Sequence, residues 1–545
     1  MEDEEEITFK EKEIIQHNKS SQNMILYYLT ILCFLIFIFI TICSLYIHNK
    51  GNYNTTTSNK NLKGQKKILN NDSNNKSQVV IPKKKTHTFS ILLPGKNCPN
   101  KNLFTIYLKR KKDNHNYNEL AEKNIKISSL KYYEQSFFTE TKEEFREVKL
   151  KELGLKLKES MDMHNLYILP YSVSRKLRNS IKKSIKNKHQ KINRFFNSFE
   201  YVSKSSLYDN YKNMKEVFPS EYNYMLETYS YPEDKDIINE KFANYSFEKS
   251  SKDNLWLVKP KYGSLGDSIS ILKNISTIKK GYLITKYLNN PHLIKGYKYD
   301  LRIHGLVTSI KPLKIYLYNE GLVRVASELY DPNDQSNDFA ILTNLYLNKR
   351  NKKKFVYPKN LDNIEDSNLW NLEAFEKYCI RNGLNYNKMI EDIGDIFIKF
   401  VFSVRKKIIE EINNYKLKSS NFFHLIGFDI LFDENLKPYL LEANRRCGLR
   451  DDNDAEKYYT HNIIADTINL IGIRIINREK NNIYNATKYK DEIEEDVDDS
   501  MCEFDRPRGG YKLIFPLKNN YEKYRKYYLA EIPEEDKKLW KLLKE

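Results

Sequence analysis

The stretch from residue 427 to 444, GFDILFDENLKPYLLEAN, constrains the fold of this chain more than any other. Two apolar runs flank the turn-forming triplet DEN, which predicts an antiparallel β-hairpin. A turn centred between residues 435 and 436 places Asp429 opposite Glu442, with Asn444 on the same face as Glu442. Facing carboxylates repel each other, whereas two carboxylates and an amide oxygen suit Mg²⁺. The hairpin therefore predicts either a magnesium site at these three residues or an acidic face exposed to solvent.

Residues 255–330 contain four further runs that predict strands, because they are rich in β-branched and aromatic residues: LWLVKP, GYLITKYL, YDLRIHGLVTS and LKIYLYNEGLVRVAS. Alternation along YDLRIHGLV places Asp300, Arg302 and His304 on one face of a strand. Such a face belongs either to a polar site or to a sheet surface in water.

The loop that follows Lys259 contains Gly263 and Gly266. Glycine lets a backbone approach phosphate groups closely and present its N–H groups to them, and the lysine can reach phosphate oxygens. The pattern is neither a P-loop nor a Rossmann fingerprint, so on its own it is a weak indication of nucleotide binding.

The organisation of the chain follows from its apolar and polar runs. Residues 24–47 carry no charge and are long enough to cross a bilayer, so they predict a single transmembrane helix after an acidic segment, 1–23. A buried core helix and a signal peptide are the alternatives. Lysines are denser after the run than before it, which favours a cytosolic C-terminal part. Residues 48–87 predict a disordered lysine- and asparagine-rich linker, and the acidic run at 491–499 predicts an exposed loop.

The 545 residues carry a formal charge of +19, which indicates either a solvated basic surface or a face for an acidic partner. No nucleic-acid-reading motif is present, so we expect no nucleic acid partner. The six cysteines, at positions 33, 43, 98, 379, 447 and 502, lack metal-type spacing and are interpreted as free thiols in a reducing compartment.

Taken together, these motifs resemble the tubulin tyrosine ligase-like family, whose members have an ATP-grasp fold. The matching stretches run in order over roughly 155–525, and KYDLR, EGLVR, GFDIL and LLEAN at these separations make the resemblance specific. It implies an α/β (α+β) ATP-grasp fold with mixed and antiparallel sheets. The implied domains are the N-terminal and central subdomains at 88–250, the catalytic ATP-grasp subdomain at 251–475, and an acidic loop and C-terminal tail at 476–545.

The resemblance also implies roles for individual residues. Arg302 and Arg324, with Glu442, would lie at the reacting centre, where guanidinium groups can hold a carboxylate. Asp429, Glu442 and Asn444 would be the magnesium ligands. The residues implied to bind ATP are Lys259, Leu265, Gly266, Thr285, Lys286, Tyr287, Leu288, Lys298, Tyr299, Asp300, Thr343 and Asn344.

The function that the resemblance implies is ATP-dependent ligation of an amino acid to a protein carboxylate through an acyl phosphate. The stretches KPKYGSLGDSISI and SEYNYMLETYSYP are most similar to the branches that add glutamate to glutamate side chains of tubulin tails. The implied partners are tubulin and microtubules, with free L-glutamate as co-substrate and ATP and Mg²⁺ as cofactors. The membrane helix would place a cytosolic catalytic domain near the microtubule cytoskeleton.

Some positions depart from the family pattern. Ser268 stands where the family has a glycine, Ile341 where it has a histidine, and RRCGL at 445–449 where it has a proline and a serine. Leu345 and Tyr346 also differ at positions that help choose the amino acid. An inactive nucleotide- or tubulin-binding scaffold, a glycine or tyrosine donor, and a non-tubulin acceptor therefore stay open as alternatives.

Overall fold

The computed structural model describes most of the C-terminal two thirds of the chain and short pieces before it. The described residues are 90–92, 96, 98–99, 105–107, 136–139, 156–157, 165–169 and 173–544, apart from gaps at 244–254, 263–268, 335, 359–363, 446, 448, 450–453, 475, 478–481 and 484–490. The predicted transmembrane helix at 24–47, the acidic segment before it and the linker at 48–87 lie outside these residues. Among the described residues, no helix is both long and apolar enough to cross a membrane.

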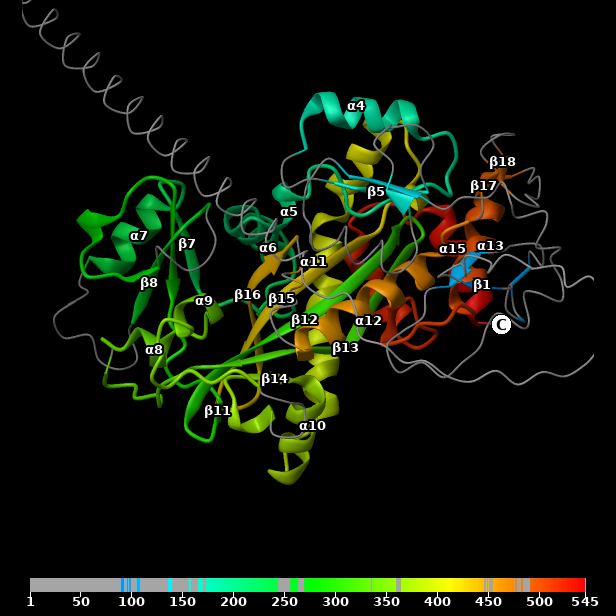
Figure 1. The fold of residues 1–545 in the computed structure, drawn as a ribbon. Coiled ribbons are helices and arrows are strands. Elements are labelled where there is room, and N and C mark those ends of the chain that lie inside the picture. The colour runs from blue at the N-terminus through cyan, green and yellow to red at the C-terminus, as the bar shows by residue number, and fades with distance from the viewer. Residues whose placement is uncertain are drawn as a thin grey trace, which may run out of the picture. The chain divides into compact units, whose positions relative to one another are not determined.

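A seven-stranded sheet forms the centre of the fold (Figure 1). Its strands, all joined in antiparallel pairs, are β14 (Leu369–Asn371), β13 (Leu313–Val325), β12 (Tyr297–Ile310), β15 (His424–Phe432) and β16 (Pro438–Asn444), with β11 (Leu293–Ile294) on β12 and β19 (Tyr511–Phe515) on β13. The strands β12 and β13 are the longest, with 14 and 13 residues.

Among the described residues, four smaller sheets accompany the central one. The antiparallel sheet β7 (Thr228–Tyr231), β10 (Tyr282–Lys286), β8 (Trp256–Pro260) and β9 (Ser270–Ile271) lies beside it in Figure 1. A parallel sheet joins β4 (Lys156–Leu157), β3 (Ser136–Thr139), β5 (Leu166–Ile168) and β6 (Lys191–Ile192). Two pairs complete the set, β1 (Ser90–Leu92) with β2 (Thr105–Tyr107) and β17 (Ile476–Asn477) with β18 (Asn482–Ile483). The predicted mixture of α and β structure with antiparallel sheets is confirmed.

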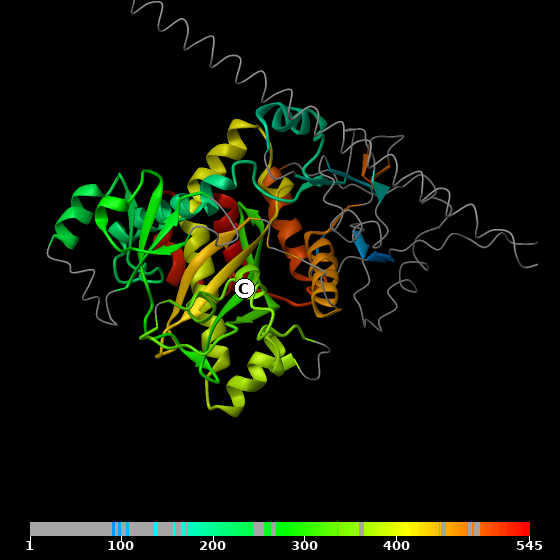
Figure 2. The ribbon, with the colours of Figure 1, turned by 60° about the vertical axis from the view of Figure 1, so that its left-hand side comes forward.

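Helices cover both faces of the central sheet, as Figures 1 and 2 show. On one face α11 (Tyr386–Asn414) packs Phe397 and Phe400 against Phe428 of β15, with ring centroids 4.6 and 5.1 Å apart. This contact is close because Gly305 of β12 has no side chain where the Phe397 ring lies. On the other face α12 (Asp454–Ile471) forms a second apolar cluster with β12 and β13.

The described helices between residues 173 and 544 are α4 (Arg175–Ser184), α5 (Phe199–Val202), α6 (Lys204–Val217), α7 (Lys235–Phe242), α8 (Asp338–Ile341), α9 (Leu345–Asn348), α10 (Leu372–Arg381), α11, α12, α13 (Glu492–Phe504), α14 (Tyr521–Arg525) and α15 (Glu534–Lys544). Several begin at the side-chain caps that their sequences offer. Ser203 accepts a hydrogen bond from the backbone of Ser206, and Asn385 from that of Lys388.

The predicted hairpin is confirmed as β15 and β16, with Asp429 opposite Glu442. The turn is centred at Asn435, half a residue earlier than predicted, because Leu431 pairs with Tyr439 and Phe432 with Pro438. A β-bulge restores the predicted pairing. Ile430 pairs with Leu440 and Asp429 pairs with Glu442, so Leu441 has no residue opposite it.

One prediction about the C-terminal part is wrong. The acidic run at 491–499 is not an exposed loop but the first half of α13, which Asp491 caps through the backbone of Ile493. Acidic residues in a first turn stabilise a helix through its dipole, and Lys188 and Arg474 pair with this run. The segment after 476 also adds β19 to the central sheet.

The interpretation of all six cysteines as free thiols is also wrong. Cys98 and Cys502 form a disulfide across a sequence separation of 404 residues, which no spacing rule could reveal. Cys379 and Cys447 are buried thiols outside any disulfide, and Cys33 and Cys43 lie outside the described residues.

Candidate functional site

A cavity of about 110 Å³ lies where the small antiparallel sheet faces the central sheet. It brings together many of the residues that the sequence singled out: Lys259, Lys286, Tyr287, Leu288, Lys298, Asp300, Arg324, Thr343, Asn344, Asp429 and Glu442. Leucine side chains from both sheets complete its wall, among them Leu257 and Leu431. The cavity therefore combines an apolar wall with several charges.

Four charged side chains form one network on β12, β13 and β15. Asp300 is the cross-strand neighbour of Arg324, and Arg302 that of Asp429. The Arg324 Nε lies 2.5 Å from Asp300 Oδ1, and its Nη2 lies 3.0 Å from Asp429 Oδ2. Arg302 holds both oxygens of Asp429, the second at 3.0 Å. Cross-strand opposite charges stabilise such a sheet.

The network shifts the pKa values of its carboxyl groups in opposite directions. Burial acts to raise the pKa of Asp429, but the charges of Arg302 and Arg324 outweigh it and hold this pKa at about 2. Asp300 has a raised pKa, because burial, together with the charge of Asp429, outweighs its pairing with Arg324. Thr343 donates a hydrogen bond to the Asp300 carboxyl group.

Two lysines line the cavity from different sheets, Lys298, which is buried, and Lys259, which is half-buried. Burial lowers the pKa of Lys298 to about 7. Its Nζ donates to the Tyr287 hydroxyl at 2.7 Å and to the Ile341 carbonyl at 2.9 Å. Burial also lowers the pKa of Lys259, against the opposing effect of the Glu442 charge. Negative groups in the cavity would stabilise the charged forms of both lysines.

The predicted metal ligands differ in how available they are. Glu442 is 34% exposed and lies 3.5 Å from Lys204 at the start of α6. The Asn444 Nδ2 atom is buried and has no hydrogen-bond partner among the described residues. Asp429, in contrast, shares both of its oxygens with arginines.

Other predicted residues lie elsewhere. Tyr299 points to the opposite face of β12, where its ring packs at 5.4 Å from Phe375 in the core. Thr285 accepts a hydrogen bond from Thr228 at 3.3 Å and does not line the cavity. Arg302 lies behind Asp429 rather than on the wall. Leu265 and Gly266 lie outside the described residues, as does Ser268.

Sequence reasoning missed Lys204, the ion-pair partner of Glu442. It lies more than two hundred residues before Glu442, and the only local signal is the helix start at Ser203, which says nothing of a partner. Most leucines of the cavity wall were also not predicted as site residues, because leucines in strands usually belong to the hydrophobic core. The backbone carbonyl of Ile341 accepts hydrogen bonds from Lys298 and Tyr287.

The chain is similar in sequence to tubulin-modifying enzymes. The chain is 34% identical over 297 residues to a tubulin monoglutamylase, TTLL4 of Mus musculus, which is 53% of this chain and 24% of the relative. It is 30% identical over 375 residues to a probable beta-tubulin polyglutamylase of Tetrahymena thermophila (63% and 30%). It is 28% identical over 349 residues to tubulin polyglutamylase TTLL7 of Xenopus tropicalis (62% and 36%).

These matches span about a quarter to a third of the length of the relatives. The family model described as "Tubulin-tyrosine ligase family" matches residues 182–483, which is more than half of the chain and includes every described residue of the cavity. The chain therefore belongs to the tubulin-tyrosine ligase family.

Proposed function

We propose that this chain is an ATP-dependent ligase with an ATP-grasp fold that adds glutamate to glutamate side chains of tubulin tails. The observation that carries the proposal is one cavity that brings together Lys259, Lys298, Arg324 and the facing carboxylates of Asp429 and Glu442. The names of the relatives support tubulin as the acceptor and glutamate as the donor.

ATP fits the donors that the cavity offers. Its phosphates would compensate the charges of Lys259 and Lys298, and its base would lie against Leu257 and Leu431 beside Tyr287. Lys298 is already positioned by the Tyr287 hydroxyl and the Ile341 carbonyl, so its charge is preorganised.

The residues also fit Mg²⁺. Glu442 offers an accessible carboxylate, and the unpartnered amide of Asn444 can present its oxygen when the amide group is turned. Asp429 would complete the set while it shares its oxygens with the arginines. When bound, Mg²⁺ neutralises charge on the phosphates of the nucleotide.

The proposed reaction has two steps. The acceptor carboxylate takes the terminal phosphoryl group of ATP, which gives an acyl phosphate and ADP. The α-amino nitrogen of free glutamate then forms the amide bond as phosphate leaves, and the nitrogen loses a proton. Arg324 and Arg302 would steady the negative charge that develops and hold the donor's carboxylate, since both are fixed by Asp429.

The net charge of the chain and the predicted transmembrane helix suggest its partners, tubulin and a membrane. A chain with a net charge of +19 is complementary to an acidic tubulin tail. The helix predicted at 24–47 would hold the enzyme at a membrane near microtubules, with its catalytic part in the cytosol.

An inactive nucleotide- or tubulin-binding scaffold is the second candidate function. It is favoured by the engagement of both Asp429 oxygens with Arg302 and Arg324, which leaves this carboxylate less available to a metal.

One experiment separates the two functions. The full-length chain is incubated with tubulin, ATP, Mg²⁺ and a mixture of glutamate, glycine and tyrosine, and the tubulin tails are analysed by mass spectrometry. The Glu442→Gln variant should lose all additions. The Glu434→Gln variant is the matched control, because Glu434 lies in the exposed turn of the same hairpin and outside the cavity.

Glutamate additions that disappear only in Glu442→Gln would establish the ligase and its donor together. Additions of glycine or tyrosine instead would identify a different donor. Unmodified tubulin, combined with a magnesium-dependent rise in melting temperature with ATP, would reject tubulin ligation in favour of the scaffold or of a ligase with another acceptor.

A further inference from the structure

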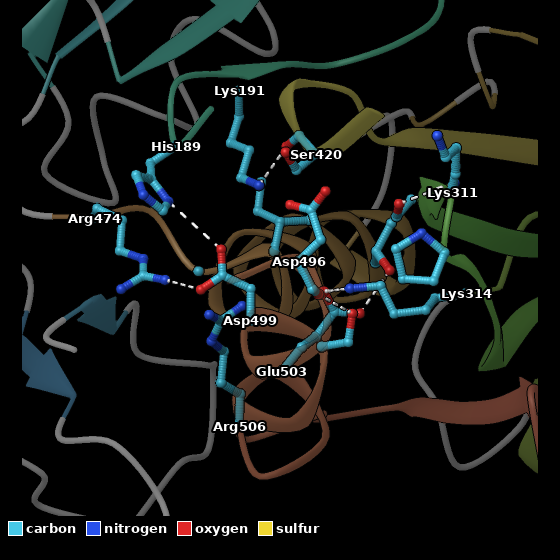
Figure 3. A pocket seen from close by; sticks show the side chains of 16 residues that line it. His189, Lys191, Lys311, Lys314, Ser420, Arg474, Asp496, Asp499, Glu503 and Arg506 are labelled. Carbon is cyan, nitrogen blue, oxygen red and sulfur yellow. Dashed lines mark hydrogen bonds and ion pairs between the residues drawn. The ribbon is translucent and has the colours of Figure 1, made fainter. Parts of the chain in front are cut away.

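A second cavity, of about 30 Å³, lies at the other end of the β12–β13 hairpin. Side chains from β6, from the turn between β12 and β13, and from α13 point into it (Figure 3). It shares no lining residue with the first cavity. Asp300 and Thr308 lie eight residues apart on β12, so the two cavities are about 25 Å apart along this strand.

The three carboxylates that line this cavity already have cationic partners. Glu503 accepts hydrogen bonds from Lys314 at 2.8 Å, Thr308 at 2.6 Å and Tyr316 at 2.9 Å. Asp499 pairs with Arg474 at 2.6 Å, and Asp496 with Lys188 at 2.7 Å. The negative charges of the cavity are therefore balanced within the protein.

Two cations of the lining are not balanced in this way. Lys191 Nζ donates to the Ser420 carbonyl at 2.6 Å, and Arg506 Nη1 donates to the Leu470 carbonyl at 3.0 Å. In the part of the chain that the structure describes, neither side chain has a carboxylate within ion-pair distance. Burial, with the charges of Arg506 and Lys314, lowers the pKa of Lys191 to about 7, although Asp499 acts against it.

The third group of interest in this cavity is the buried hydroxyl of Ser420. The Ser420 Oγ atom is inaccessible to solvent and has no hydrogen-bond partner among the described residues. It belongs to the residue whose carbonyl accepts from Lys191. A hydroxyl, an ammonium and a guanidinium thus line one small space that holds more positive than negative charge.

A metal ion does not suit the same region. His189, Glu495 and Asp499 lie near enough to one another to suggest ligands. Lys188, however, lies 3.2 Å from Glu495 and 3.6 Å from Asp499, and Arg474 holds Asp499. Two protein cations therefore already lie among these carboxylates, which disfavours a metal ion there.

We propose that this second cavity binds a phosphate-type dianion, held by Lys191, Arg506 and the Ser420 hydroxyl. Such an anion would stabilise the charged form of Lys191 and offer oxygens to Arg506, and the volume fits one tetrahedral group rather than a peptide. Guanidinium and ammonium groups are the usual protein donors to phosphate oxygens. Inorganic phosphate and the phosphate group of a small ester share this chemistry. The proposal is independent of the proposed ligase function, because it concerns a different cavity.

The test is equilibrium dialysis of the full-length chain against radiolabelled inorganic phosphate. A non-hydrolysable ATP analogue with Mg²⁺ is present at saturation, so that the first cavity does not take up phosphate. We expect saturable binding of one phosphate per chain. Lys191→Met and Arg506→Gln should each weaken it by about tenfold or more, since each removes one charged donor. Unlabelled glycerol 3-phosphate as competitor distinguishes a site open to esters from one limited to free phosphate.

Lys311→Met is the matched control. Lys311 lines the same cavity, but it is 39% exposed and pairs with Glu535 at 3.0 Å, so its loss should leave phosphate binding within about twofold of wild type. Phosphate should also raise the melting temperature of the wild type and of Lys311→Met, but not that of Lys191→Met. This second measurement also shows whether each variant is folded.

Three results would overturn the proposal. The first is an absence of saturable phosphate binding once the nucleotide analogue is bound. The second is unchanged binding in folded Lys191→Met and Arg506→Gln variants. The third is an equal loss in Lys311→Met, which would indicate unspecific attraction to a basic surface.

Discussion

Asp429→Asn should destabilise this protein although it changes only one atom of the side chain. Asp429 is buried, 8% exposed, and carries the charge that compensates Arg302 and Arg324. Its pKa falls from 3.8 to about 2, which corresponds to about 2.5 kcal/mol at about 1.36 kcal/mol per unit. Removing one partner of a buried ion pair generally costs about 3–5 kcal/mol. We therefore expect a loss of about 2–4 kcal/mol at pH 7.

The stability that the Asp429 carboxylate contributes depends on pH. A lowered pKa in the folded state stabilises the protein above the unfolded-state pKa, near 3.8, and the contribution is lost as pH falls toward 2. The stability gap between wild type and Asp429→Asn should therefore be constant from pH 7 to about 5 and about 1 kcal/mol smaller at pH 3.

The assay is urea unfolding followed by tryptophan fluorescence, since Trp370 is buried within strand β14 of the same sheet. Glu442→Gln is the matched control, an acid-to-amide change on the facing strand at a side chain that is 34% exposed. It should change stability by less than about 0.5 kcal/mol. An Asp429→Asn variant as stable as this control at pH 7, or a gap that does not narrow in acid, would refute the reasoning.

Further predictions concern four other positions. Glu442→Gln should abolish the magnesium-dependent rise in melting temperature with ATP while leaving the apo protein as stable as wild type; a retained rise would exclude this residue as a ligand. Burial raises the pKa of Glu411 to about 7, so the folded state favours its protonated form and wild-type stability should fall by about 1–3 kcal/mol as pH rises from 4.5 to 7. Urea midpoints of Glu411→Gln should lack this slope, and an identical slope would contradict the assignment. Gly305→Ala should cost about 1–3 kcal/mol in urea unfolding, because the added Cβ would lie 2.3 Å from the Phe397 ring, and Phe397→Leu should partly restore stability if this contact is the cause. Cys98→Ser should lower the thermal stability by about 2–4 kcal/mol without reductant and have little effect in dithiothreitol, whereas an equal loss in both would point away from the disulfide.

The sequence predicted the main hairpin and its facing carboxylates, but partly through compensating errors. The turn is half a residue from the predicted centre, and the bulge at Leu441 restores the pairing of Asp429 with Glu442. The same bulge lets Leu441 line the cavity. A bulge has no reliable signature in a single sequence, because it depends on the register in which the strand pairs with its neighbours.

Alternation along a strand also explains which site residues were placed well. Lys298 and Asp300 line the cavity, whereas Tyr299 between them is in the core, as a period of two requires. Features that depend on distant partners could not be predicted. Lys204 beside Glu442 and the basic partners of α13 are examples, since the fold alone brings these residues together.

The disulfide between Cys98 and Cys502 has a consequence for how this protein breaks apart. It closes a covalent ring of the chain that contains the whole of the matched family region, 182–483. A protease that cuts the backbone once inside the ring leaves both pieces attached, so the nicked protein should separate on a denaturing gel only after reduction. A cut before Cys98, in contrast, releases the N-terminal segment and leaves the ring intact. In the oxidised protein, the strand pair β1–β2 and the helix α13 therefore stay tethered through a nick that would otherwise divide the molecule.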